Sequence, residues 1–218
     1  MTNTYLEELK SIIESRLALI QPNETLIQES KGSLEIPTLL KIALKNEMEA
    51  TIVGAKWVGN TPETFCKLVF AKQVGDEAKH YRLIEDRLKD LGVDLINFDP
   101  LAPDLSPLTK HLLSLKTTIE KAAGGPFARE SIAVVKNEQF LNLLDERGDI
   151  ETENLYRNTI QKDEAYHKQL GETLLKKLIK TKEDFLLAKQ AIDSTLDLAE
   201  ELTKQAAEKK GIVNAPGC

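Results

Sequence analysis

The chain of 218 residues lacks the features that mark disulfide-rich, secreted or membrane-spanning proteins. It has only two cysteines, Cys66 and Cys218, which are too few for a disulfide framework and fit a reducing cytoplasm. No apolar run approaches the roughly 20 residues that a membrane-spanning helix needs, so we expect no membrane partner. Residues 1–8 lack the basic and apolar regions of a signal peptide, and we therefore expect none.

Positive charge in excess is also lacking. The 29 lysines and arginines are scattered among 35 acids, and the net charge is −6. Because phosphate binding needs a concentrated basic face, we expect no nucleic-acid partner. Hydrophobic residues make up 41% of the chain, which is enough to form a buried core without stabilising disulfide cross-links. We expect a single cytoplasmic domain over residues 1–218.

The alternation typical of strands is missing, and helical periodicity takes its place. No proline lies between positions 62 and 100 or between 126 and 216, which leaves room for long helices. The pattern predicts helices over residues 4–20, 34–58, 62–91, 107–123, 126–146, 149–180 and 182–209.

Cap and breaker residues set the expected helix ends. Thr61-Pro62 predicts a helix with Thr61 as its N-cap, and Ser106-Pro107 predicts another start. Gly124-Gly125-Pro126 predicts a break between two helices. Thr181 and Asp184 form a capping pair for the last helix.

The spacing of these helices favours an all-α bundle. Tight turns at 59–61 and 147–149 predict two hairpins, and the long connection at 92–107 predicts a crossover between them. We expect a four-helix core over about 34–180, with an extra N-terminal helix at 4–20. The charged helix at 182–209 is expected to be a solvated cover or a contact in a homodimer.

One pentad occurs twice. Residues 76–80 and 163–167 both read Asp-Glu-Ala-x-His, and each falls inside a predicted long helix. Residues three apart share a helix face, so each Glu points the same way as its His. Two such helices facing one another would supply two imidazoles and two bridging carboxylates from Glu77, His80, Glu164 and His167.

This repeat has a less specific interpretation, in which both pentads lie on solvated helix faces. Acids are 35 of the 218 residues, so matching acids at both preceding offsets of two histidines has a chance on the order of one in a thousand. The chain has only three histidines, and two of them lie in the repeat, which favours a metal site.

The motif resembles that of the ferritin-like di-iron carboxylate superfamily, in which two helices each give one Glu and two others each give Glu-x-x-His. The leading Asp is similar to the oxygen-activating branch, which includes bacterial multicomponent monooxygenases, acyl desaturases and ribonucleotide reductase small subunits. The resemblance implies that Asp76 and Asp163 accept hydrogen bonds from metal-bound imidazoles, each from the opposite helix.

The family pattern requires one further Glu in each hairpin, at about the same distance from the turn as its partner. Glu130 and Glu164 both lie 17 residues from position 147, whereas Glu138 lies only nine away and is the alternative. In the first hairpin, Glu47 lies on a stripe of apolar and small residues, where burial without a partner would be costly. Glu49 shares a more solvated face, so we predict Glu47 and keep Glu49 as the alternative.

The predicted ligand set suits two iron ions, or an iron–manganese pair. The resemblance implies an enzyme that uses O2, with electrons from an unknown donor, to oxidise a small organic substrate of apolar character. Iron oxidation or peroxide scavenging, as in ferritins and rubrerythrins, is the second hypothesis, in which Glu49 and Glu138 would serve as transit sites. A metal-free helical interaction module is the third.

The remaining residues with functional side chains are expected to have structural roles. Packing is the preferred interpretation for Tyr81, Tyr166 and Cys66, and Trp57 is expected to anchor the core. His111, which has no acid three residues before it, is expected at the surface or in the core.

Overall fold

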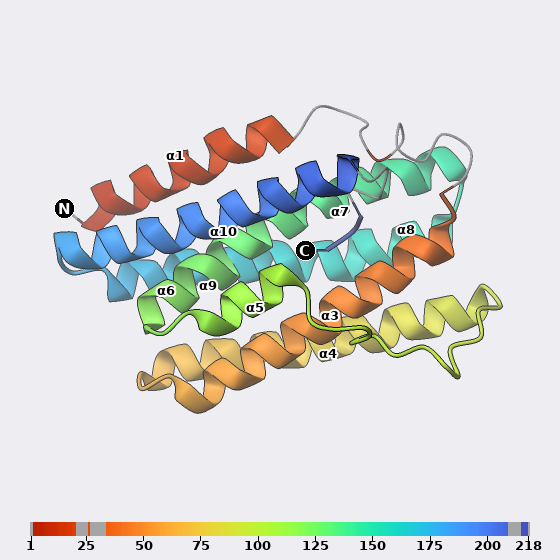
Figure 1. Cartoon of the computed structure of the whole chain (residues 1–218), viewed down its shortest axis with the longest axis horizontal. Coiled ribbons are helices and arrows are strands. Elements are labelled where there is room, and N and C mark those ends of the chain that lie inside the picture. Colours follow the sequence, from red (N-terminus) through yellow and green to blue (C-terminus); the bar gives the residue numbers. More distant parts are fainter. Residues whose placement is uncertain (1, 21–25, 27–33, 209–214, 218) are drawn as a thin grey trace.

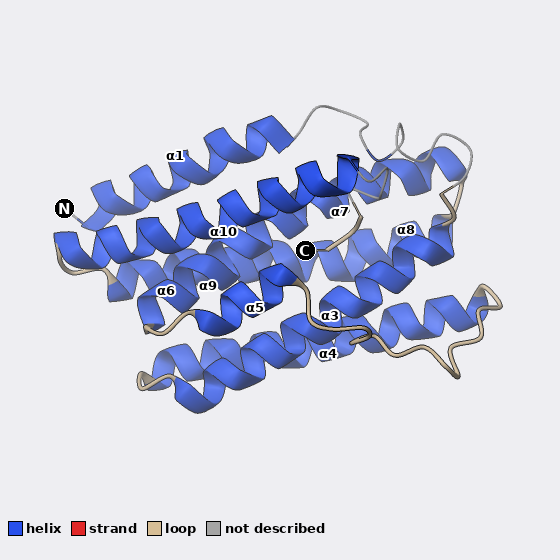
Figure 2. Ribbon diagram, viewed as in Figure 1, coloured by secondary structure: helices blue, strands red, loops and turns tan. Residues whose placement is uncertain are grey.

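The computed structural model describes residues 2–20, 26, 34–208 and 215–217. Within these residues every regular element is a helix and no strand occurs, as Figure 2 shows. The prediction of an all-α fold is therefore confirmed. No helix in the described ranges combines the length and apolar character needed to cross a membrane.

The first hairpin consists of α3 (Ile36–Asn60) and α4 (Thr64–Asp90), which pack along each other's length. The second helix begins two residues later than predicted. Thr61 is the C-cap of α3, and its buried side chain caps nothing, while Glu63 is the N-cap of α4. The Thr61-Pro62 pair thus forms the turn rather than the helix start.

A long connection leads from α4 to α5 (Pro107–Ser114). The Ser106 side chain accepts a hydrogen bond from the Thr109 amide at 3.1 Å, which confirms the predicted cap. The predicted helix 107–123 is wrong, because the chain turns at residues 115–117 and restarts as α6 (Thr118–Ala122). Thr117 and Glu120 form a capping box there that satisfies the new backbone donors.

Gly124-Gly125-Pro126 does not break the helix, contrary to the prediction. The segment forms the π-helix η1 (Ala123–Arg129), which joins α6 to α7 (Glu130–Arg147). Bonds from residue i to i+5 widen this turn, so the proline can be accommodated. A Cβ at Gly125 would lie 2.4 Å from the Trp57 ring, which explains the need for glycine here.

The second hairpin turns at Gly148, whose φ of 69° requires the left-handed conformation. The returning helix consists of α8 (Ile150–Leu155), the π-helix η2 (Tyr156–Ile160) and α9 (Gln161–Leu178). Asp149 caps it by accepting from the Thr152 amide at 3.0 Å.

Two further helices cover the hairpins. In Figure 1, α1 (Thr2–Ile20) and α10 (Lys182–Glu208) lie on the side opposite α4. The predicted Thr181–Asp184 capping pair is confirmed by reciprocal hydrogen bonds of 3.1 and 2.9 Å. One face of α10 is part of the core, so this helix is more than a solvated cover. Residue 209 and Cys218 lie outside the described residues.

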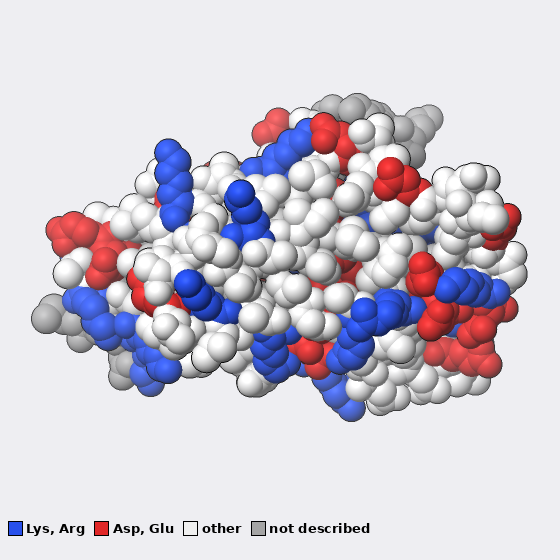
Figure 3. Space-filling view, turned by 90° about the horizontal axis from the view of Figure 1, so that it is seen from below, with Lys and Arg blue, Asp and Glu red and all other residues white. Residues whose placement is uncertain are grey.

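The core contains two apolar clusters with a polar layer between them. One cluster surrounds Trp57, Phe70 and Phe127, and the other surrounds Phe140 and Tyr156. On α3, α4 and α9 the predicted metal ligands fall between the segments that feed these clusters. On the face seen in Figure 3, lysines and arginines are interspersed with acids, without a broad basic area among the residues drawn in colour.

Candidate metal centre

The structure brings all six predicted ligand residues into one buried cluster. Their donor atoms form two groups of four, and within each group these atoms lie within 4.8 Å of one another. Glu77 and Glu164 belong to both groups. The first group is completed by Glu47 and His80, and the second by Glu130 and His167. Each group is therefore compact enough to hold a metal ion.

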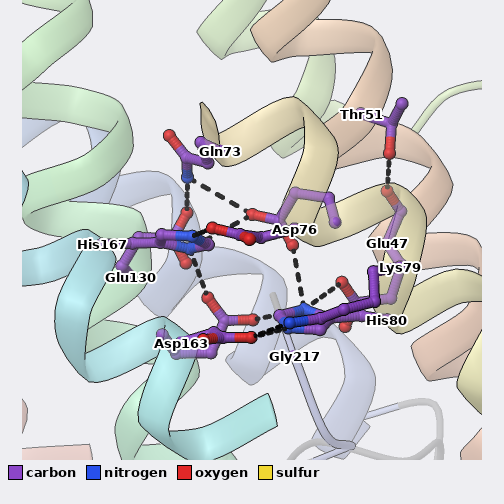
Figure 4. Close-up of polar contacts among 12 residues, drawn as sticks. Glu47, Thr51, Gln73, Asp76, Lys79, His80, Glu130, Asp163, His167 and Gly217 are labelled. Carbon is purple, nitrogen blue, oxygen red and sulfur yellow. Dashed lines mark hydrogen bonds and ion pairs between the residues drawn. The ribbon is translucent and has the colours of Figure 1, made fainter. Parts of the chain in front are cut away.

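The two pentads face one another from α4 and α9, while α3 and α7 each contribute one glutamate (Figure 4). The imidazole ring centroids of His80 and His167 are 6.4 Å apart. All six residues are at most 3% exposed. Helical i, i+3 spacing thus positions each Glu and His of a pentad side by side, as the sequence predicts.

Each imidazole is oriented by an aspartate from the opposite helix. Nε2 of His80 lies 3.0 Å from Asp163 Oδ2, and Nε2 of His167 lies 3.0 Å from Asp76 Oδ2. When Nε2 donates to the aspartate, Nδ1 is left to bind a metal, and both Nδ1 atoms face the glutamates. The crosswise pairing matches the expected geometry.

Two lysines of α4 support these aspartates. Lys72 bonds Asp76 within the same helix, and Lys79 reaches across to Asp163 on α9 at 2.5 Å. Burial opposes ionisation of both aspartates, but the hydrogen bonds from the lysines and imidazoles outweigh it and hold the pKa of each below its usual value. Both aspartates thus stay charged and able to accept from the imidazoles.

The glutamates carry more negative charge than this interior accommodates without cations. Burial raises the pKa of Glu47 to about 7, and burial with the neighbouring carboxylates raises the pKa of Glu164 well above its usual value. Burial would lower the pKa of His80, but the carboxylates of Glu47 and Glu77, which lie 3.4 and 3.5 Å from Nδ1, raise it to about 12. The cluster therefore favours bound positive charge, as protons or as metal ions.

Several donor atoms of the cluster have no hydrogen-bond partner although they are buried. These atoms are Glu47 Oε2, Glu77 Oε2, Glu130 Oε2 and His80 Nδ1. A buried polar atom without a partner is costly, and a metal ion at this position would complete its bonding. The carboxylate and imidazole donors thus fit divalent metal ions in both chemistry and charge.

The two alternative carboxylates lie elsewhere. Glu49 is also buried, but it accepts from the Ser106 amide at 2.8 Å and from Thr109 Oγ1 at 2.6 Å, and so it anchors the start of α5. Glu138 is exposed, near Gln161. Neither belongs to the two groups of donor atoms.

The prediction missed two residues that touch the ligands. Gln73 Nε2 donates to Glu130 Oε1 at 2.6 Å, and Arg129 donates to the same oxygen at 2.7 Å. Gln73 lies one helical turn before Glu77, and this spacing in the sequence indicates that both side chains lie on the same face of the helix. Arg129 directly precedes Glu130 in the chain, but its inward direction depends on the π-helical segment.

A narrow pocket adjoins the cluster at Glu130. Glycine, alanine, valine, leucine and tryptophan residues form most of its wall, and Gln73, Arg129 and Glu130 supply the polar part. Its free space of about 10 Å³ is on the scale of one water molecule. The pocket is thus large enough for a diatomic gas, and an organic molecule would require a lining side chain to move.

The other residues singled out in the sequence have structural surroundings. Trp57 and Cys66 are buried in the core, and burial raises the pKa of the Cys66 thiol to about 12. His111 bonds Thr195 Oγ1 at 3.1 Å, and Lys72 lies over the exposed ring of Tyr166. Tyr81 packs against the Phe140–Tyr156 cluster.

Comparisons with models of protein families, with curated proteins and with solved structures gave no match to this chain.

Proposed function

We propose that the chain is a non-haem di-iron oxidoreductase with a ferritin-like bundle, which uses O2 to oxidise a small apolar organic substrate. The observation that carries this proposal is the pair of four-residue groups that share Glu77 and Glu164. A dinuclear centre requires carboxylates that are shared between two sets of ligands, each of which includes one histidine. Four carboxylates would be neutralised by two divalent ions.

The donor set favours iron, or iron with manganese. Carboxylate oxygens and imidazole nitrogens suit these ions, and no thiolate is present among the six clustered residues to favour zinc or copper. Glu47 and His80 would hold one ion, Glu130 and His167 the other, and Glu77 and Glu164 would bridge them. Two ferrous ions bound here would supply two electrons for the reduction of dioxygen.

The side chains around the cluster have two roles: they orient the metal ligands and they exclude water from the centre. Asp76 and Asp163 hold the imidazoles with Nδ1 toward the glutamates, and the apolar clusters on both sides keep bulk water away. The pocket at Glu130 gives a gas-sized approach beside one half of the centre. Repeated turnover would need an external electron donor.

Iron handling is less well supported than oxidation of an organic substrate. That alternative depended on Glu49 and Glu138 as transit sites, but Glu49 is engaged in the cap of α5 and Glu138 lies outside the cluster. Neither residue forms a path of carboxylates to the centre.

Anaerobic loading with ferrous iron, followed by elemental analysis and oxygen-consumption measurements, tests the proposal. We expect about two iron ions per chain and a stoichiometric uptake of oxygen on exposure to air. Iron and manganese contents far below one per chain would contradict the proposal and favour a metal-free interaction module. Continuous conversion of added ferrous iron to mineral would favour the iron-handling alternative.

A further inference from the structure

The short segment 215–217 returns to the bundle and is buried there. Ala215 belongs to the apolar cluster that contains Phe140 and Tyr156. Figure 1 shows this segment in the middle of the molecule, beside the C label, and Figure 4 shows Gly217 directly below His80. The segment therefore occupies a slot between α3 and α7, which we call the tail slot.

Two asparagines recognise a single peptide group of this segment. Asn46 Nδ2 donates to the Pro216 carbonyl at 3.0 Å, and the Gly217 amide donates to Asn137 Oδ1 at 2.9 Å. This carbonyl and this amide belong to the same peptide bond, whose two polar groups point in opposite directions. Side chains from two helices thus form hydrogen bonds with both the carbonyl and the N–H of one secondary amide.

The tail slot has hydrogen-bonding capacity that the segment does not use. Asn137 Nδ2, on the side chain that accepts from Gly217, is buried and has no partner. An amide nitrogen can donate two hydrogen bonds, and leaving such a group buried and unsatisfied is costly. A ligand with an additional acceptor would satisfy more of the slot than Ala215–Gly217 does.

The tail slot also lies next to the candidate metal centre. Asn46 directly precedes the ligand residue Glu47 in α3, and a Cβ added at Gly217 would lie 3.1 Å from Asn46 Nδ2.

We propose that the tail slot is a binding site for a small molecule with a secondary amide between apolar groups, such as an N-acyl amino acid, and that residues 215–217 occupy it as an internal competitor. That this ligand is also a substrate rests on the proposed function, whereas its binding does not. The hydrogen bonds to Asn46 and Asn137 supply the recognition, and Ala215 marks where an apolar group packs.

Calorimetric titration with the peptide N-acetyl-Ala-Pro-Gly-amide tests this proposal. A variant without residues 215–218 should bind one peptide per chain, and the intact chain should bind it at least roughly tenfold more weakly, because a tethered segment competes at high effective concentration. Gly217→Ala offers a second route that keeps the chain length. Its φ of 76° and the contact with Asn46 disfavour a side chain, so the tail should be displaced and the peptide should bind more tightly than to the intact chain.

Asn137→Ala in the shortened chain should weaken peptide binding roughly tenfold, since one hydrogen bond and its geometry are lost. Asn158→Ala changes an exposed asparagine of η2 and should leave peptide affinity unchanged. A folded shortened chain that fails to bind the peptide, or that binds it no better than the intact chain, would overturn the proposal. Iron content is measured on the same samples, so a chain that binds peptide but no iron contradicts only the proposed function.

Discussion

The two hairpins present the same pentad but position it differently. In the first hairpin, α3 and α4 run through the metal centre as regular α-helices. In the second, the π-helices η1 and η2 precede the ligand-bearing segments of α7 and α9. Each π-helical segment changes the helical register, so residues such as Glu130 point inward although a glycine–proline break is expected before them.

The carboxylates that belong to only one half of the centre also differ in their support. Glu130 accepts from Gln73 and Arg129, whereas Glu47 Oε2 has no partner. Part of the negative charge of Glu130 is thus already compensated by a guanidinium. A bound cation is therefore stabilised more strongly by the uncompensated charge of Glu47, and we expect the half of the centre that contains Glu47 to bind its ion more tightly.

The largest effect is expected from the residues that both halves share. Glu77→Gln or Glu164→Gln removes a charge that both ions need, so the iron content should fall from about two per chain to well below one. Elemental analysis after anaerobic loading measures this. Glu85→Gln, which changes a carboxylate of α4 outside the cluster, is the control and should keep both ions. Full iron content in both cluster variants would show that the two groups do not form one centre.

The next effect separates the halves. Glu47→Gln and Glu130→Gln should each reduce the iron content to about one ion per chain, because each removes a ligand of a single group. Titration calorimetry of ferrous iron should show that Glu47→Gln removes the tighter step and Glu130→Gln the weaker one. The reverse assignment would mean that Arg129 strengthens rather than weakens its half of the centre.

Substitution of the two aspartates tests the crosswise support. Asp163→Asn should weaken the ion at His80 and Asp76→Asn the ion at His167, each by about 10- to 100-fold, since the imidazole loses its charged acceptor. The measurement is the same two-step titration. An equal loss in both steps for each variant would indicate a general disturbance of the fold instead.

The smallest expected effects concern packing in the two hairpins. A Cβ at Gly171 would lie 2.7 Å from the backbone of η1, so Gly171→Ala should destabilise the second hairpin by about 2–4 kcal/mol. Gly75 of α4 has open space around it, so Gly75→Ala should stabilise the protein by about 0.5–1 kcal/mol. Urea unfolding of the metal-free proteins compares them. Equal stability of the two variants would contradict the close approach of α9 and η1.

Much of the candidate centre could be predicted because it depends on local periodicity. The face shared by Glu77 and His80 follows from the helical repeat, and equal distances from a turn selected Glu130 over Glu138. Gln73 was missed, although it lies one turn from Glu77, because a glutamine on a helix is usually solvated. The continuous helix through Gly124-Gly125-Pro126 could not be predicted, since its stability depends on contacts with Trp57 and α9.

The sequence alone determined the helical class and the two acid–imidazole faces, because both arise from residues a few positions apart on one helix. Tertiary structure alone decided which aspartate orients which histidine, that Glu49 anchors α5, and that residues 215–217 fill the slot between Asn46 and Asn137. These contacts join residues 57 to 170 positions apart, and helical periodicity carries no information over such separations.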